Sequence, residues 1–488
     1  MGRYKKLTLL HSNDMHGDFL AENTDQNLAG GVSMLSGYVD RVRREEANTL
    51  YCIAGDMFRG SVIDSEFMGL STIEIMNAIA PDVVTLGNHE TDYGIAHLLF
   101  LEKCAKFPII NANLYIKSNF ARLFKSHIVL EADGMKILFI GIITESVMKS
   151  AKNDTSVGSF VDIHEAATEI GRICNAYNAT DIDLTVLLTH IGFEEDKELA
   201  SQLDKAWGVD IIIGGHSHTF IEKPEIVNDI LIVQAGTGTD QIGRFDIVVD
   251  TAENNIESWQ WQAVPINSST CPKDEDIEKI LGTYKQQTDA KYNRIITRLA
   301  RRLTHPTRTQ ETELGGLFAD ILAQSLGLDI MLVGSGSIRT DGMGPLVMYR
   351  DLVETFPYDS PVYMLKISGV QLKQMLLYML RDEVWQGAHT SFLQLSGRLK
   401  VVYDIPHSKM TYFEFDGQPI KDEMIFTVGV QQYQYNNFER TFGTDIALVE
   451  KNGKARVVAT SITDVLEEYL TSHQHISHHT DGRLTLIK

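Results

Sequence analysis

The sequence predicts an α/β protein, and three features of the chain support this fold class. Strand-like apolar runs alternate with amphipathic, helix-like segments from the start of the chain to about residue 270. Five of these runs lead into acid, amide or imidazole side chains, a pattern typical of sheet edges that carry sites. The 488 residues, 43% hydrophobic and 22% charged, are sufficient for two or three domains with full cores. Together these features predict βαβ units packed in layers.

The five apolar runs are the expected strands of the first half of the chain. Loops that leave the carboxyl ends of neighbouring parallel strands converge, so polar residues placed there meet although they lie far apart in sequence. In chain order the runs are residues 7–10, 50–54, 83–86, 184–188 and 211–213, and the polar residues that follow are Asp14 with His16, Asp56, Asn88, His190, and His216 with His218. A single histidine after a strand is more often structural, but five clusters in this order favour one shared site.

This set of seven side chains has the composition of a metal site. It mixes carboxylates, an amide and imidazoles without a thiolate, which suits Mn, Zn, Fe, Co or Ni. Seven donors are too many for one tetrahedral ion, but they suit two divalent ions that share a bridging carboxylate. Paired metal ions are a recurring solution for displacement at phosphorus. Because Asp14 and Asp56 supply only two negative charges, such a site stays positive and attracts a phosphate dianion, although the whole chain carries −21.

Helical segments are expected between and after these strands. Leu35, Tyr38, Val39 and Val42 have the spacing of one helix face, and residues 164–178 indicate a second helix. Pro272 and the acids that follow it indicate the start of a third, because acidic side chains in the first turn interact favourably with the helix dipole.

A change in character near residues 300–308 predicts a domain boundary. The basic stretch 298–302 and Pro306 are typical of a linker. The sequence therefore predicts two domains, residues 1–305 and 306–488. The second part has its own expected elements, which are strands at 330–333 and 426–430 and a helical apolar stripe from Leu372 to Met379.

Charge and composition exclude several function classes. A net charge of −21 argues against binding to polymeric nucleic acid or to an anionic membrane surface, since both require a basic face. The four cysteines are scattered without a CxxC pair, so a disulfide framework is not expected. No apolar stretch reaches the length of a membrane span. The first strand is expected from Leu7, which leaves no room for a signal peptide and predicts a cytoplasmic protein.

The strand-end motifs resemble those of a known family. Five segments are similar to the five motifs of calcineurin-like metallophosphoesterases. They are Asn13-Asp14-Met15-His16-Gly17, Gly55-Asp56, Gly87-Asn88-His89-Glu90-Thr91-Asp92, Thr189-His190 and Gly214-Gly215-His216-Ser217-His218. The order of these motifs and the residues within them most resemble those of the 5′-nucleotidase family. This resemblance implies a four-layer αββα sandwich followed by a smaller α/β C-terminal substrate-binding domain.

The resemblance also implies a role for each residue of the site. It implies Asp56 as the bridging ligand, and His89 with Asp92 as a catalytic pair outside the metal coordination. In this pair the carboxylate would orient the imidazole, which would stabilise the phosphoryl or leaving oxygens. The remaining ligands divide into Asp14, His16 and His218 for one metal, and Asn88, His190 and His216 for the other.

Residues of the second part resemble the substrate-binding domain of the same family. Arg339 ends a Gly-Ser-Gly-Ser-Ile-Arg segment, and Arg308 precedes a Leu-Gly-Gly segment, so the resemblance implies both as substrate-binding residues. It also implies that Tyr358 and Tyr433 sandwich the base, which needs only an aromatic face. Gly334 replaces the family's asparagine, and the segment 434–439 lacks the family's Gly-Gly-Asp-Gly, so base and ribose specificity do not carry over.

The expected function is a dinuclear-metal hydrolase that releases phosphate from nucleoside 5′-monophosphates through attack of a metal-bound hydroxide. The expected cofactors are two divalent ions, which are Mn, Zn, Co or Fe, and the expected partner is a small-molecule nucleotide. One alternative is a phosphodiesterase or pyrophosphatase acting on cyclic nucleotides, dinucleotides or nucleotide sugars. Another is a non-catalytic nucleotide-binding protein, against which stands the presence of every ligand and of the His89–Asp92 pair.

Overall fold

The computed structural model divides the chain into two compact units, Met1–Thr288 and Asp289–Lys488. It describes residues 3–24, 27–116, 119, 121–143, 157–160, 163–177, 179–381 and 392–487. The division falls within helix α7 (Glu275–Tyr292). The domain boundary predicted at 305/306 from the sequence stays a prediction.

The N-terminal unit is built on two six-stranded sheets. All five strands expected from the apolar runs are present, and none of them is an edge strand of its sheet. The first sheet has the order β16 (Asn255–Pro265), β15 (Gln241–Asp250), β1 (Tyr4–Ser12), β4 (Thr49–Ala54), β5 (Val83–Thr85) and β6 (Ile109–Ile110). The second has the order β13 (Glu225–Val227), β14 (Ile230–Val233), β12 (Ile211–Ile213), β11 (Leu184–His190), β9 (Met135–Ile143) and β8 (His127–Ala132).

The strand pairing explains why the candidate site residues can meet. Strands β1, β4, β5 and β6 run parallel to one another, as do β9, β11, β12 and β14. Because the strands of each set run in the same direction, their carboxyl ends lie at the same edge of each sheet. Antiparallel strands β15 and β16 extend the first sheet, and β8 and β13 flank the second.

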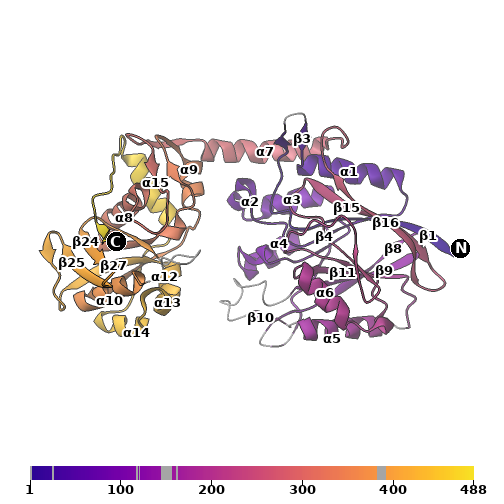
Figure 1. Ribbon diagram of the computed structural model, residues 1–488. Coiled ribbons are helices and arrows are strands. Elements are labelled where there is room, and N and C mark those ends of the chain that lie inside the picture. The colour runs from indigo at the N-terminus through magenta and orange to yellow at the C-terminus, as the bar shows by residue number, and fades with distance from the viewer. Residues whose placement is uncertain are drawn as a thin grey trace. The chain divides into compact units, whose positions relative to one another are not determined.

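Four layers result from the way these sheets bury their apolar faces. One core cluster lies between the sheets and includes Leu9 of β1 and Val186 of β11. A second packs the outer face of the first sheet against helices that include α1, and a third packs the outer face of the second sheet against helices that include α5. Figure 1 shows α1 and α3 on one side of the strands and α5 and α6 on the other. The αββα arrangement that the resemblance implied is therefore confirmed.

The helices of this unit follow the expected apolar patterns. Leu35, Tyr38, Val39 and Val42 are all buried on one face of α1. The helix predicted at 164–178 is α5, although residue 178 lies outside the described residues. The helices are α1 (Val32–Glu45), α2 (Val62–Glu66), α3 (Leu70–Ile79), α4 (Ile95–Cys104), α5 (Ile163–Ala176) and α6 (Phe193–Gln202), with short 3₁₀ turns η1 (His89–Thr91) and η3 (Lys205–Trp207). The described part of this unit also contains two short ribbons, β2 (Glu22–Asn23) with β3 (Leu28–Ala29) and β7 (Leu114–Ile116) with β10 (Val157–Phe160).

The C-terminal unit is also α/β, as expected. Its five-stranded sheet has the order β23 (Leu393–Leu395), β19 (Ile330–Gly334), β27 (Ile425–Gln431), β22 (Val362–Ser368) and β28 (Arg456–Ala459). A four-stranded sheet has the order β26 (Gln418–Pro419), β25 (Lys409–Phe415), β24 (Leu399–Asp404) and β29 (Leu484–Ile487). Two ribbons pair β17 (Ile295–Arg298) with β21 (Leu346–Met348) and β18 (Leu303–Thr304) with β20 (Gly342–Met343).

Helices of the C-terminal unit pack against these sheets, and one core cluster joins both sheets with α10 and α13. The apolar stripe predicted from Leu372 to Met379 is the buried face of α10. The helices are α8 (Glu313–Ser325), α9 (Tyr349–Thr355), α10 (Gly369–Met379), α12 (Gln432–Asn436), α13 (Phe438–Phe442), α14 (Ile446–Val449) and α15 (Ile462–Ser472), with 3₁₀ turns η4 (Ser335–Ser337) and η5 (Glu450–Asn452).

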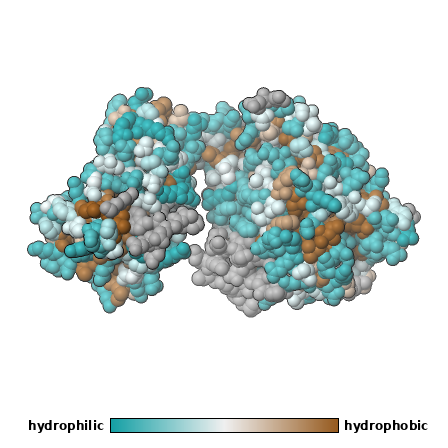
Figure 2. Space-filling model, in the orientation of Figure 1, coloured by the Kyte–Doolittle hydropathy of each residue, from teal (hydrophilic) through white to brown (hydrophobic). Residues whose placement is uncertain are grey.

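The surface of both units is mainly hydrophilic on the face seen in Figure 2, with smaller hydrophobic areas. None of the helices in the described part of the chain combines the length and the apolar composition that a membrane span requires. The predicted cellular location stays a prediction.

Candidate metal centre

Six of the seven candidate ligands lie in loops at the carboxyl ends of β1, β4, β5 and β12, and His190 is the last residue of β11. Five of them have left-handed backbones with φ between 49° and 79°, namely Asp14, His16, Asp56, His216 and His218. This conformation is uncommon for residues other than glycine and is concentrated at functional sites, where surrounding contacts hold it. The strain is therefore located at the strand ends where the sequence predicts a site.

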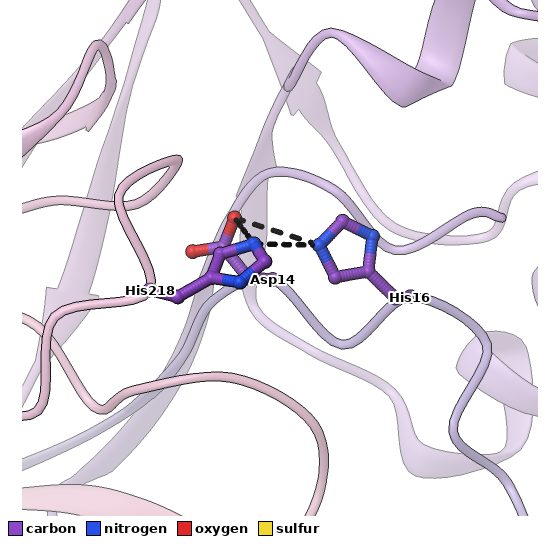
Figure 3. Close-up of side chains that lie close together, drawn as sticks. All are labelled: Asp14, His16 and His218. Carbon is purple, nitrogen blue, oxygen red and sulfur yellow. Dashed lines mark hydrogen bonds and ion pairs between the residues drawn. The ribbon is translucent and has the colours of Figure 1, made fainter. Parts of the chain in front are cut away.

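Asp14, His16 and His218 form one group whose ligand atoms lie within 4.8 Å of one another (Figure 3). The two imidazoles face each other, with 2.9 Å between their Nε2 atoms. Asp14 Oδ1 lies 3.5 Å from His218 Nε2 and 3.9 Å from His16 Nε2. Asp14 is fully buried, and the backbone N–H of His216 donates to it, so the carboxylate is fixed between the two loops.

Asp56, His190 and His216 form a second group with the same spacing. Asp56 Oδ2 lies 3.1 Å from His190 Nε2, and the Oδ1 of Asn88 lies 3.1 Å from His216 Nδ1. Asp56 Oδ2 is also 3.9 Å from His16 Nε2 of the first group. The Asp56 carboxylate therefore lies between the two groups, the position that a bridging ligand needs.

The surroundings of His190 show that this site fits a cation. His190 is fully buried, and its Nδ1 donates to the carbonyl oxygen of Ala54 at 2.8 Å, so in the neutral ring the lone pair is on Nε2. That Nε2 faces the Asp56 carboxylate at 3.1 Å, yet it has no hydrogen-bond partner among the described residues. A buried lone pair aimed at a carboxylate is costly unless a positive ion lies between them. Orientation of a histidine through a backbone carbonyl is also the usual arrangement for a metal ligand.

His89 and Asp92 lie beside the two groups. His89 Nδ1 is 2.7 Å from Asp92 Oδ2, and this hydrogen bond raises the pKa of His89 above its ordinary value. The His89 ring is 5.2 Å from the ring of His16, between centroids. His89, His16 and Asp56 also satisfy the spacing of a metal group, so geometry alone permits His89 as a ligand.

Two residues that the sequence reasoning did not single out hold the ligand loops. Glu90 is buried, and its carboxylate accepts the backbone N–H groups of Asp56, Met57 and Gly87, thereby joining two ligand-bearing loops. Its place next to His89 in the quoted motif was the only sequence signal. Burial raises the pKa of Glu90 to about 7.

Gln234 holds the loop that carries His216 and His218. Its Oε1 accepts hydrogen bonds from Ser217 Oγ and the backbone of Thr219, at 3.0 and 3.3 Å. Its Nε2 donates to the carbonyl oxygen of Gly215 and to the buried carboxylate of Asp196, both at 3.2 Å. A lone glutamine after a strand gives no sequence signal of such a role.

Glycine is required where these loops approach each other. A Cβ atom on Gly87 would lie 2.2 Å from Asp56 Oδ1, and one on Gly215 would lie 2.6 Å from the carbonyl oxygen of Ala54. Any side chain at either position would displace a candidate ligand or the carbonyl that orients His190.

The four candidate substrate residues lie in the C-terminal unit. The guanidinium carbon of Arg339 lies 5.2 Å from the centre of the Tyr358 ring, so the structure brings these two together. Tyr358 and Tyr433 are 45% and 62% exposed, which makes both rings accessible to a ligand. Tyr433 lies on α12, directly after β27, and Arg308 is exposed in the loop before α8.

One buried side chain joins the segments that carry Arg339 and Tyr433. Strands β19 and β27 are parallel neighbours, so the segments that follow them leave the same edge of the sheet. At that edge Gln431 Oε1 accepts the backbone N–H of Gly334 at 2.8 Å, and its Nε2 donates to Ser337 Oγ at 3.1 Å.

Comparison with known proteins gives a consistent result across the chain. Residues 7–220 match the calcineurin-like phosphoesterase family, and residues 287–444 match the 5′-nucleotidase C-terminal domain. A 5′-nucleotidase-related protein from Glossina morsitans morsitans is 26% identical, over 99% of this chain and 94% of its own length. The 5′-nucleotidase of Mus musculus is 24% identical, over 98% and 90%. The solved structure of a 5′-nucleotidase precursor from Thermus thermophilus has a similar fold, with a TM-score of 0.66, 23% identity and 99% of each chain covered.

Proposed function

Since the chain belongs to the 5′-nucleotidase family and is a metal-dependent phosphoesterase, we propose that it releases phosphate from nucleoside 5′-monophosphates with two divalent ions. The observation that carries the proposal is the pair of ligand groups with Asp56 between them. Seven donors arranged in this way exceed the needs of one ion and match those of two.

We assign Asp14, His16 and His218 to one ion, Asn88, His190 and His216 to the other, and Asp56 to both. The donor set of carboxylate, amide and imidazole favours Mn, Zn, Co or Fe over Mg. When bound, the two ions would supply the positive charge that attracts the phosphate and activates water.

The His89–Asp92 pair would act on the reacting phosphate. The carboxylate of Asp92 favours the protonated imidazole of His89, which is the form that can donate a hydrogen bond to a phosphoryl or leaving oxygen. Because Asp92 is bonded to Nδ1, the Nε2 atom remains as the donor toward substrate.

Residues of the C-terminal unit would bind the nucleoside. Tyr358 and Tyr433 offer exposed aromatic faces for the base, and Arg339 and Arg308 offer charged hydrogen-bond donors. The side chain of Arg339 lies against Tyr358, so one ligand could contact both.

A phosphate-release assay tests this function. The chelated protein is supplied with Mn, Zn, Co or Mg and offered nucleoside monophosphates, diphosphates, cyclic nucleotides, dinucleotides and nucleotide sugars. We expect no turnover after chelation, recovery with a transition metal, and preference for 5′-monophosphates. Full activity in a metal-free sample contradicts the metal mechanism. Preference for cyclic nucleotides or pyrophosphate bonds would identify a phosphodiesterase or pyrophosphatase instead, and nucleotide binding without turnover would identify a non-catalytic protein.

A further inference from the structure

Arg59 contacts the His89–Asp92 pair although it belongs to a different loop. It lies three residues after Asp56, between β4 and α2. Its Nε is 3.2 Å from Asp92 Oδ2, the same oxygen that lies 2.7 Å from His89 Nδ1. One carboxylate oxygen therefore lies between a guanidinium and an imidazole.

A ring of contacts fixes the position of Arg59. Its backbone N–H donates to Asp64 Oδ2 at 2.9 Å, and the hydroxyl of Tyr93 donates to that same oxygen at 2.7 Å. The Arg59 guanidinium lies over the Tyr93 ring, with 5.0 Å between its carbon and the ring centre. Asp64 is fully buried, so both ends of the arginine are attached to a rigid part of the unit.

The backbone at this position is strained in the same way as that of the candidate ligands. Fifteen described residues other than glycine have positive φ; five of them are candidate ligands, and Arg59, at 67°, is in a loop that carries one. The next residue, Gly60, packs so tightly on the His16 loop that an added Cβ would lie 2.1 Å from the His16 carbonyl oxygen. Such strain persists only where surrounding contacts require it.

We propose that Arg59 is a positioning residue that holds Asp92 in place so that Asp92 keeps His89 oriented. The Arg59 and Asp92 side chains are 44% and 21% exposed, so their ion pair adds little to folding stability. Its effect is on geometry: with Oδ2 held from two sides, the Asp92 carboxylate loses the freedom to rotate away from His89. A planar guanidinium with a stacked aromatic suits this role better than a flexible ammonium. The inference rests on the proposed catalytic role of His89.

A double-mutant cycle tests this role with p-nitrophenyl phosphate, a substrate without a nucleoside. Arg59→Ala is expected to lower kcat about fivefold, the order of one partly exposed ion pair, with KM and bound metal unchanged. In the His89→Ala background, and in the Asp92→Asn background, the same change is expected to have no further effect, because there is no longer an oriented pair to hold.

Arg3→Ala is the matched control. Arg3 also pairs with an aspartate, Asp250, and lies 5.4 Å over a tyrosine ring, that of Tyr4, but at the opposite end of β1 from Asp14. Arg3→Ala is expected to leave kcat unchanged. This result would show that loss of an arginine–aspartate pair matters only for the pair of Arg59 with Asp92.

Several outcomes would overturn the proposal. A higher KM with unchanged kcat would make Arg59 a substrate contact, and loss of metal would make it a support of the metal loops. If Arg59→Ala lowers kcat by the same factor in the wild-type and His89→Ala backgrounds, Arg59 does not act through His89. If His89→Ala itself retains full activity, the proposed role of His89 fails. If His89→Ala is impaired while Arg59→Ala is normal, only the role of Arg59 fails.

Discussion

The side chains of His89 and Asp92 meet because they are three residues apart on a 3₁₀ turn. His89 begins η1 and Asp92 follows its end, with a backbone hydrogen bond from Asp92 N–H to the carbonyl oxygen of His89. In a 3₁₀ helix, residues i and i+3 lie on the same face. The local backbone therefore brings Nδ1 and Oδ2 within reach of each other, and they lie 2.7 Å apart.

His89→Ala is expected to lower kcat by about 10²–10⁴-fold, the range for loss of a positioned acid–base or charge-stabilising group. The backbone N–H of residue 89, which donates to Asp56 Oδ1 at 2.8 Å, remains in the variant, so bound metal should stay near normal. Steady-state kinetics and metal analysis of the purified variant check this.

His97→Ala is the control, since His97 is in α4 of the same unit and its ring bonds only to the carbonyl oxygen of Met68 among the hydrogen bonds described. A His89→Ala protein that loses metal and recovers activity when metal is added would identify His89 as a ligand, as its spacing to His16 and Asp56 permits.

Sequence patterns predicted the strands, which the structure contains, and a ligand set, which stays a prediction although its side chains lie close together, because both depend on short-range order. An apolar run and the polar residue at its end are adjacent in the chain, and parallel pairing then brings those ends together. The contacts that hold the ligands are different. Arg59 and Asp92 are 33 positions apart, and Gln234 and Asp196 are 38 apart, so only the folded chain shows that they touch.

Gln234→Leu is expected to weaken metal binding by about 10–100-fold, the usual cost of removing a group that orients metal ligands. The change leaves Ser217 and Thr219 without the acceptor that holds the His216–His218 loop. Titration calorimetry or equilibrium dialysis with Mn or Zn measures the affinity.

Gln394→Leu supplies a matched comparison. Gln394 is a buried glutamine with three hydrogen bonds, to Thr312, Gln310 and Ser335, none of which is a candidate ligand. The metal affinity of the Gln394→Leu variant should match that of the wild type even if the thermal stability of the variant is lower. Equal affinities in all three proteins would remove Gln234 from the support of the site.

Glu313 is expected to make the stability of the protein depend on acid pH. Hydrogen bonding to Arg301 holds the pKa of Glu313 at about 2, below its ordinary value of about 4.5. A carboxyl whose pKa is depressed in the folded state contributes stability above its unfolded pKa, and this contribution is lost as pH falls from about 4.5 toward 2.

The variant Glu313→Gln should therefore be less stable than the wild type at pH 7, and the difference should shrink across that window. Urea unfolding from pH 7 to the lowest pH at which the wild type stays folded measures it. Glu423→Gln, at an exposed position of the same unit, controls for general effects of removing a carboxylate. A difference between Glu313→Gln and wild type that is independent of pH would show that the loss comes from packing or from the bond to Thr304 rather than from charge.

For the C-terminal unit, a sequence resemblance located aromatic residues but could not say whether their rings are accessible. Exposure depends on what the folded chain packs against each ring. Tyr435, two residues after Tyr433, is stacked on Tyr363 at 4.0 Å between ring centroids, whereas Tyr433 is 62% exposed. The two tyrosines look alike in the sequence, and the structure distinguishes a packed ring from an accessible one.

Tyr433→Ala is expected to raise KM for nucleoside monophosphates by the equivalent of about 1–3 kcal/mol, the usual contribution of one stacked base, with little change in kcat. The reason is that a ring which binds the base interacts equally with ground state and transition state. p-Nitrophenyl phosphate has no nucleobase, so its kcat/KM should change little.

Tyr412→Ala, at a tyrosine that is 41% exposed on β25, is the matched control and should leave kcat/KM unchanged for both substrates. Equal losses on both substrates would indicate general damage to the fold. No loss on either would leave Tyr433 without a role in substrate binding and favour a phosphoesterase that does not select nucleotides.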